Sequence, residues 1–227
     1  MKISEGYRYV IGCDEVGRGS LAGPVVASAV ILPMPEANDK SKVESYKVIK
    51  SCGIKDSKLL SPEKRQELEP IIKAHALAWG MGVVSEKIID EINIHNASFL
   101  AMRKAVESLL SVAQPRGLLL AARQAEGPHY KERGDSCFLS VDGKFKVPGL
   151  FIPQEAVVNG DNKIISIAAA SIIAKVYRDN LMRKLHKHYP IYNFFQHKGY
   201  ATAEHRQQIL KNGLSAIHRL SFCHQFT

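Results

Sequence analysis

The feature that most constrains the fold is a set of short apolar segments, rich in β-branched residues, separated by glycine, proline or acidic residues. Residues 7–13, 25–32 and 78–84 are each predicted to form a buried strand. Only a glycine-rich link, residues 17–23, separates the first two, so we expect an antiparallel hairpin there. The longest stretch without a charge, residues 19–35, is 17 residues long and contains glycine and proline. It is too short and too broken to cross a membrane.

Helical patterns dominate the later part of the chain. Apolar residues at helical spacing predict helices over residues 88–110 and 166–188, and Pro190 is expected to end the second. Ser61 followed by Pro62 is typical of a helix start, and this helix is expected to reach residue 73. The fold class is therefore mixed α/β. The other expected elements are a surface loop at 36–51, strands at 137–141 and 155–158, and a helix capped by Thr202 that ends near Gly213.

Basic charge is concentrated at the C-terminal end. The chain of 227 residues has 31 Lys+Arg and 22 Asp+Glu, a formal net charge of +9. Residues 171–227 contain nine of these basic residues and only two acidic ones. This asymmetry indicates a polyanionic partner, most simply nucleic acid, although a solvated basic helix face explains the charge equally well. Since no signal-peptide pattern begins the chain, we expect a cytoplasmic protein with no membrane association.

Acidic residues end three of the predicted strands. Asp14 and Glu15 follow the first, and Asp142 and Asp161 follow two later ones. Strand ends of α/β sheets commonly gather a site at one edge. Carboxylates that converge there would repel by about 4 kcal/mol per close pair at an effective dielectric constant of about 20, a cost that a divalent cation offsets. Oxygen ligands favour Mg²⁺ or Mn²⁺, and a basic surface nearby favours phosphodiester hydrolysis. The alternative, that each acid is only a turn or cap residue, stays open.

Six motifs follow one another along nearly the whole chain. They begin with GCDEVGRGSLAGPVVA at residues 12–27, DSKLLS at 56–61 and VDG at 141–143. The fourth is GD at 160–161 followed by IAAASIIAKVYRD at 167–179. The last two are HKGYAT at 197–202 with His205, and HRLSF at 218–222. In this order they resemble the signatures of the bacterial ribonuclease HII family.

The resemblance implies a ribonuclease H-like fold, a mixed central sheet flanked by helices. It implies a catalytic domain over residues 1–190 and a small helical substrate-binding subdomain over residues 191–227. It also implies an endonuclease that hydrolyses the RNA strand of RNA–DNA hybrids and cuts 5′ of single ribonucleotides embedded in duplex DNA. The products would carry 5′-phosphate and 3′-hydroxyl ends. We expect the protein to act on these substrates as a monomer.

The family's four acidic positions fall on Asp14, Glu15, Asp142 and Asp161. The resemblance implies that they hold two Mg²⁺ or Mn²⁺ ions about 4 Å apart. One ion would activate a water molecule and the other would stabilise the leaving 3′ oxygen. No side-chain nucleophile is then needed.

Substrate contacts are expected from a glycine loop, two turn lysines and a tyrosine. Glycines let a backbone approach a sugar closely, where main-chain groups can bond a 2′-hydroxyl. Arg18 is equally compatible with a structural role beside the carboxylates. A lone loop tyrosine usually only packs, but beside a ribose it could stack on the sugar. The expected contacts are Gly17, Arg18, Gly19, Lys58, Lys198 and Tyr200.

Two features depart from the family pattern, and other functions compete with this one. Asn159 stands where the family usually has lysine, and the polar segment 113–135 is longer than usual. Ribonuclease HIII fits less well, because it usually has an extra N-terminal domain and lacks a tyrosine at the position of Tyr200. A DNA-processing nuclease, such as a junction resolvase or transposase core, would share the acids but need no 2′-hydroxyl reader. A hybrid-binding module without catalysis would not need all four acids.

Overall fold

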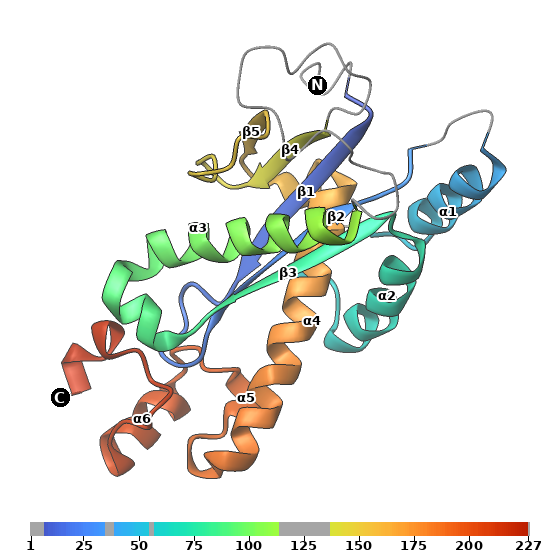
Figure 1. The fold of residues 1–227 in the computed structure, drawn as a ribbon. Helices are drawn as coiled ribbons and strands as arrows, with labels where there is room; N and C mark the ends of the chain where they lie inside the picture. Colours follow the sequence, from blue (N-terminus) through green and yellow to red (C-terminus); the bar gives the residue numbers. More distant parts are fainter. Residues whose placement is uncertain (1–6, 35–38, 55–56, 114–136, 227) are drawn as a thin grey trace.

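A five-stranded mixed sheet with helices on both faces forms the centre of the molecule (Figure 1). The computed structural model describes residues 7–34, 39–54, 57–113 and 137–226. The strand order is β3-β2-β1-β4-β5. The first three strands pair antiparallel, and β4 and β5 extend the sheet in parallel. The strands are β1 (Tyr9–Val16), β2 (Val25–Ile31), β3 (Ala78–Val84), β4 (Cys137–Asp142) and β5 (Gln154–Val157). This arrangement confirms the predicted α/β class and the predicted hairpin.

The position of each strand in the sheet explains its sequence pattern. β2 lies inside the sheet with helices on both faces, so all seven of its residues are buried and its sequence is a continuous apolar run. β3 lies at the edge and alternates buried with partly exposed residues.

The first predicted strand was too short. Asp14 and Glu15 were expected to follow its end, but both lie within β1, opposite Ser28 and Ala27 of β2. The antiparallel ladder continues as far as Val16, and so the two acids are held by backbone pairing rather than by a turn.

The predicted surface loop at 36–51 was wrong where the structure describes it. α1 (Lys40–Ser51) begins after Asp39, whose carboxylate accepts a hydrogen bond from the Lys42 N–H at 3.1 Å. Ile49 is fully buried against α2. The many lysines hid this helix, because only a narrow apolar stripe faces the core.

The other long helices agree with their predicted positions. Ser61 and Thr202 cap α2 and α6 as expected, through hydrogen bonds to Lys64 N and His205 N. α3 bends at Asn93, whose φ is 63°. Most of the 113–135 segment lies outside the described residues. The helices are α2 (Pro62–His75), α3 (Glu86–Ala113), α4 (Ile165–His188), α5 (Phe194–His197) and α6 (Ala203–Asn212). Short 3₁₀ turns are η1 (Ser57–Leu59), η3 (Gly160–Asn162), η4 (Pro190–Tyr192), η5 (Leu220–Phe222) and η6 (His224–Phe226).

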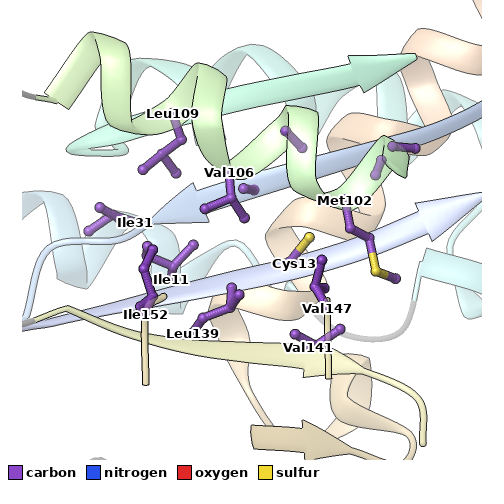
Figure 2. Close-up of a cluster of buried hydrophobic side chains, with 14 of the residues drawn as sticks. Ile11, Cys13, Ile31, Met102, Val106, Leu109, Leu139, Val141, Val147 and Ile152 are labelled. Atoms are coloured by element: carbon purple, nitrogen blue, oxygen red, sulfur yellow. The ribbon is translucent and has the colours of Figure 1, made fainter. Parts of the chain in front are cut away.

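Each face of the sheet has its own core. Figure 2 shows Met102, Val106 and Leu109 of α3 above Ile11 and Ile31 of the sheet. On the other face α4 packs closely on β1, and the small residues Ala168, Ala169 and Ala170 are buried there.

The approach between β1 and α4 depends on Gly12. A Cβ atom at this glycine would lie 2.2 Å from the backbone carbon of Ser166. This close approach sets the start of α4 directly beside the acid-bearing end of β1.

A third core joins the C-terminal segment to the body of the molecule. Tyr192, Phe194 and Ile209 pack with Leu21 and Met182, which belong to the loop after β1 and to α4. The described residues contain no helix that is both long enough and apolar enough to cross a bilayer.

Candidate active site

A cavity of about 220 Å³ lies where β1, β4 and α4 meet the C-terminal segment. Three of the four predicted acids line it, together with Tyr200. The lining residues are Asp14, Glu15, Val16, Ser57, Arg65, Asp142, Ser171, Lys175 and Tyr200. Segments that are distant in sequence thus bring carboxylates, cations and a tyrosine to one open space.

Backbone N–H groups and hydroxyls hold the acids in place. The Glu15 N–H donates to Asp14 Oδ1 at 2.7 Å, and Ser171 also hydrogen-bonds the Asp14 carboxylate. The Gly160 N–H donates to Asp142 Oδ1 at 2.7 Å. Asp161 follows that glycine and is buried in η3, although it does not line the cavity among the residues described. The bond from Gly160 therefore ties the backbone of the fourth acid to the third.

The electrostatics of this cluster favour the binding of a positive charge. Burial raises the pKa of Asp14 well above its usual range, and the negative charges of Glu15 and Asp142 raise it further. Burial also raises the pKa of Glu15, against the opposing effect of Arg18. A cation among these groups would reverse both effects.

The donor set suits a hard divalent cation, but its present arrangement does not enclose one. Every acid offers oxygen, the ligand that Mg²⁺ and Mn²⁺ prefer. Glu15 Oε2 is buried and accepts no hydrogen bond from the described residues. Within that part of the chain, however, no three acidic, histidine or cysteine side chains are close enough together to surround a metal ion. The chemistry of these residues therefore fits a divalent cation, and Glu15 Oε2 is a buried oxygen that could bind it.

Arg18 occupies the other oxygen of Glu15. Its Nη1 donates to Glu15 Oε1 at 3.0 Å, and about half of the arginine side chain is exposed. This is the structural role beside the carboxylates that the sequence left open for Arg18.

The glycines on either side of Arg18 differ in their freedom. Gly17 is buried with a φ of +94°, and a Cβ there would lie 2.2 Å from Arg178 Nε. Gly19 is exposed, and a Cβ there would meet nothing within 4 Å. The chain is therefore fixed at Gly17 and accessible at Gly19.

Tyr200 lines the cavity, whereas Lys198 is not among the described residues that line it. The Tyr200 ring lies 5.6 Å from Lys175 Nζ and 5.3 Å from the Arg178 guanidinium. Lys198 Nζ instead donates to the Phe195 carbonyl and lies over the Phe195 ring. Lys58 is in η1, but its side chain is outside the described part of the structure.

Sequence reasoning missed three polar residues of the cavity. Ser171 lies between apolar residues of α4, yet its hydroxyl bonds Asp14 and lies 2.7 Å from the Ser57 hydroxyl. Arg65 donates to the carbonyls of Ser57 and Leu60 at 2.7 and 2.6 Å, which fixes η1 at the cavity edge. Helical spacing could have found Ser171, because Lys175 is one turn later on the same face.

Comparisons with known proteins show what the chain as a whole is similar to. A family model described as Ribonuclease HII matches residues 11–225. A ribonuclease HII from Alkaliphilus metalliredigens is 41% identical over 228 residues, 96% of this chain and 91% of the relative. One from Clostridioides difficile is 44% identical over 218 residues, 96% of this chain and 71% of the relative. The crystal structure of ribonuclease H2 from Pyrococcus horikoshii is similar with a TM-score of 0.61 and 22% identity, covering 96% of each chain.

Proposed function

The chain belongs to the ribonuclease HII family, whose members are endoribonucleases that cleave RNA in RNA–DNA hybrids, and from this we propose that it also cuts 5′ of single ribonucleotides in duplex DNA. The observation that carries the proposal is the meeting of Asp14, Glu15 and Asp142 with Tyr200 in one cavity. A carboxylate cluster alone could support hydrolysis of a phosphodiester in either DNA or RNA. A residue able to contact the sugar is what a ribose-selective nuclease adds to them.

The proposed cofactor is Mg²⁺ or Mn²⁺, held by Asp14, Glu15, Asp142 and Asp161. Such ions would activate a water molecule and offset charge on the leaving 3′ oxygen, giving 5′-phosphate and 3′-hydroxyl ends. The chain's own contribution is to orient the carboxylates. Ser171 and the Glu15 N–H hold Asp14, while the Gly160 N–H holds Asp142. Substrate would have to approach Glu15 past Arg18, whose ion pair is exposed enough to rearrange.

In this proposal the ribose is read by the Gly17–Arg18–Gly19 backbone and by Tyr200. Two cations near the Tyr200 ring restrict where the ring can lie. Lys58 and Lys198 would contact phosphates, and residues 191–227 would act as the substrate-binding subdomain of a catalytic domain over 1–190. We expect a monomer that acts in the cytoplasm.

Tyr200→Ala is expected to reduce cleavage of a single embedded ribonucleotide more than cleavage of a continuous hybrid. Losing one partner of a buried polar group costs about 1–3 kcal/mol, which corresponds to roughly tenfold to hundredfold in rate. A long hybrid offers other 2′-hydroxyl groups in neighbouring registers, so its loss should be smaller. The measurement is the ratio of initial rates on the two labelled substrates.

Tyr200→Phe separates stacking from hydrogen bonding and should retain more activity than the alanine variant. The exposed Tyr177→Ala on α4 is a matched control and should leave the ratio unchanged. An unchanged ratio in Tyr200→Ala would remove this residue from ribose recognition. Cleavage of an all-DNA duplex at a comparable rate would instead favour a DNA-processing nuclease.

Binding to a hybrid should weaken steeply as salt is added. Each phosphate contacted by a lysine or arginine contributes about −0.9 to the slope of log affinity against log salt. Lys198→Met is therefore expected to make the slope shallower by about one contact. Lys40→Met, at the exposed start of α1, should leave the slope unchanged. A slope that is flat in the unmodified protein would show that the basic residues are only a solvated surface.

A further inference from the structure

Two fully buried arginines lie beside the loop between β1 and β2. Arg178 in α4 and Arg219 before η5 each have 0% exposure. We call residues 17–24 the glycine loop. In the described part of the chain, the hydrogen bonds of both guanidiniums go to backbone carbonyls and one hydroxyl, and nearly all of these belong to the glycine loop.

Arg219 uses all three of its nitrogens on the glycine loop. Nε donates to the Gly23 carbonyl at 2.9 Å, Nη1 to the Arg18 carbonyl at 2.9 Å, and Nη2 to the Gly17 carbonyl at 2.7 Å. The planar guanidinium thus holds both ends of the glycine loop on one rigid fork.

Arg178 connects the glycine loop to the segment that carries the tyrosine. Its Nε donates to the Pro24 carbonyl at 3.0 Å, and Nη2 donates to Ser20 Oγ at 2.9 Å. Its Nη1 donates to the Lys198 carbonyl at 3.0 Å, two residues before Tyr200. One side chain therefore sets the distance between the two proposed ribose contacts.

The direction of the glycine-loop carbonyls determines the direction of the N–H groups that follow them. The described chain has no cis peptide bond, and a trans peptide places its N–H opposite its C=O. Because the Gly17 and Arg18 carbonyls face Arg219, the N–H groups of Arg18 and Gly19 face away from it. Both residues are exposed, and neither N–H donates a hydrogen bond to another described residue. Two adjacent backbone donors are thus available to a ligand.

We propose that Arg219 and Arg178 are positioning residues for ribose recognition, which hold the glycine-loop carbonyls inward and present the Arg18 and Gly19 N–H groups to the 2′-hydroxyl. This inference rests on the proposed function, because it takes the glycine loop as the reader of the ribose. Burial and the charge of Arg178 lower the pKa of Arg219 to about 9, so its guanidinium remains charged at neutral pH. The carbonyl dipoles of Gly17, Arg18 and Gly23 stabilise that charge.

Arg219→Lys is the variant that separates charge from geometry. A lysine keeps the buried positive charge, but its single nitrogen cannot reach three carbonyls that the fork of the arginine bonds separately. Arg178→Lys applies the same test to the link with the Lys198 carbonyl. If charge alone stabilised this region, both lysine variants would behave like the unmodified protein.

The experiment compares Kd for a fluorescent DNA duplex containing one ribonucleotide with Kd for the all-DNA duplex of the same sequence. Binding is measured in EDTA, so that cleavage does not intervene. The unmodified protein should prefer the ribonucleotide duplex, and Arg219→Lys should lose roughly tenfold of that preference, as expected for one lost hydrogen bond. Its Kd for the all-DNA duplex should change by less than about twofold.

Leu109→Ala, in the core on the other face of the sheet, controls for lost stability and should keep the preference. A preference that survives in both lysine variants overturns the inference and leaves the proposed function standing. An equal loss in Leu109→Ala also overturns it, because general loosening would then explain the result. An unmodified protein without any preference would overturn the proposed function itself.

Discussion

Asp14→Asn and Asp142→Asn are each expected to abolish cleavage while leaving the fold intact. Both residues line the cavity, and each amide would replace a charged oxygen proposed to hold a metal ion. Removing such a ligand should cost about 4 kcal/mol of transition-state stabilisation, or roughly 10³-fold in rate. The measurement is single-turnover cleavage of a labelled hybrid, with and without Mg²⁺.

Asp14→Asn should also stabilise the protein when no metal is present. Burial and neighbouring negative charges raise the pKa of Asp14 in the folded state above that in the unfolded chain. Between those two pKa values the folded protein holds a proton that the unfolded chain has lost. The free energy of unfolding therefore falls as pH rises through this window. The asparagine variant does not titrate and so does not lose this free energy. It should therefore have a higher Tm than the unmodified protein at neutral pH in EDTA.

Glu107→Gln is the matched control, since it also removes one carboxylate but lies on the exposed side of α3. It should cleave normally and show little change in Tm. Full activity of either aspartate variant, or of the unmodified protein in excess EDTA, would contradict the proposed metal site. A lower Tm for Asp14→Asn in EDTA would contradict the predicted stabilisation. It would show that other groups of the protein offset the cost of burying the Asp14 charge.

The sequence predicted elements best where a local signal decides the structure. The strand at 78–84 and the caps at Ser61 and Thr202 were predicted at the residues where they occur, because alternation and capping depend on near neighbours. The prediction failed for α1, which has one buried residue, Ile49, and is stabilised by packing on α2. It also ended β1 early, because the pairing with β2 that extends the strand to Val16 is not visible in a single segment.

The site was predictable only in part for the same reason. Acids at strand ends and the family resemblance indicated Asp14, Glu15 and Asp142, which do come together. Ser171 looked like core because a buried serine between apolar residues has no local sign of its long-range partner. Arg219 is more than 190 residues away from the carbonyls it bonds, so no spacing rule relates them.

Acid is expected to destabilise the protein through a buried histidine pair. His205 Nδ1 lies 2.9 Å from the Tyr200 carbonyl, so that nitrogen must carry the proton. His205 Nε2 then has to accept from His218 Nε2 at 3.0 Å, while His218 Nδ1 accepts from the Ser215 N–H at 2.9 Å. All four ring nitrogens of His205 and His218 can make these hydrogen bonds only if both rings are neutral. His197 stacks on the His205 ring at 4.2 Å and adds no negative charge.

Burial lowers the pKa of both His205 and His218 to about 4, against about 6.5 in the unfolded chain. Below pH 6.5 the unfolded chain therefore takes up protons that the folded protein does not. The stabilisation is fully present above that pH and is lost as pH falls towards 4. At pH 5 the loss is about 2 kcal/mol per histidine and about 4 kcal/mol for the pair, which lowers Tm by roughly 8–16 °C.

His218→Gln should flatten this dependence. Its amide can donate to His205 Nε2 and accept from the Ser215 N–H, but it does not titrate. His188→Gln, at the exposed end of α4, is the control and should follow the unmodified protein. The measurement is Tm from pH 7.5 to 4.5 for the three proteins. Because His205 also bonds the Tyr200 carbonyl, the preference for a ribonucleotide duplex should fall in the same pH range as Tm. If Tm falls as steeply with pH in His218→Gln as in the unmodified protein, other groups cause the acid sensitivity.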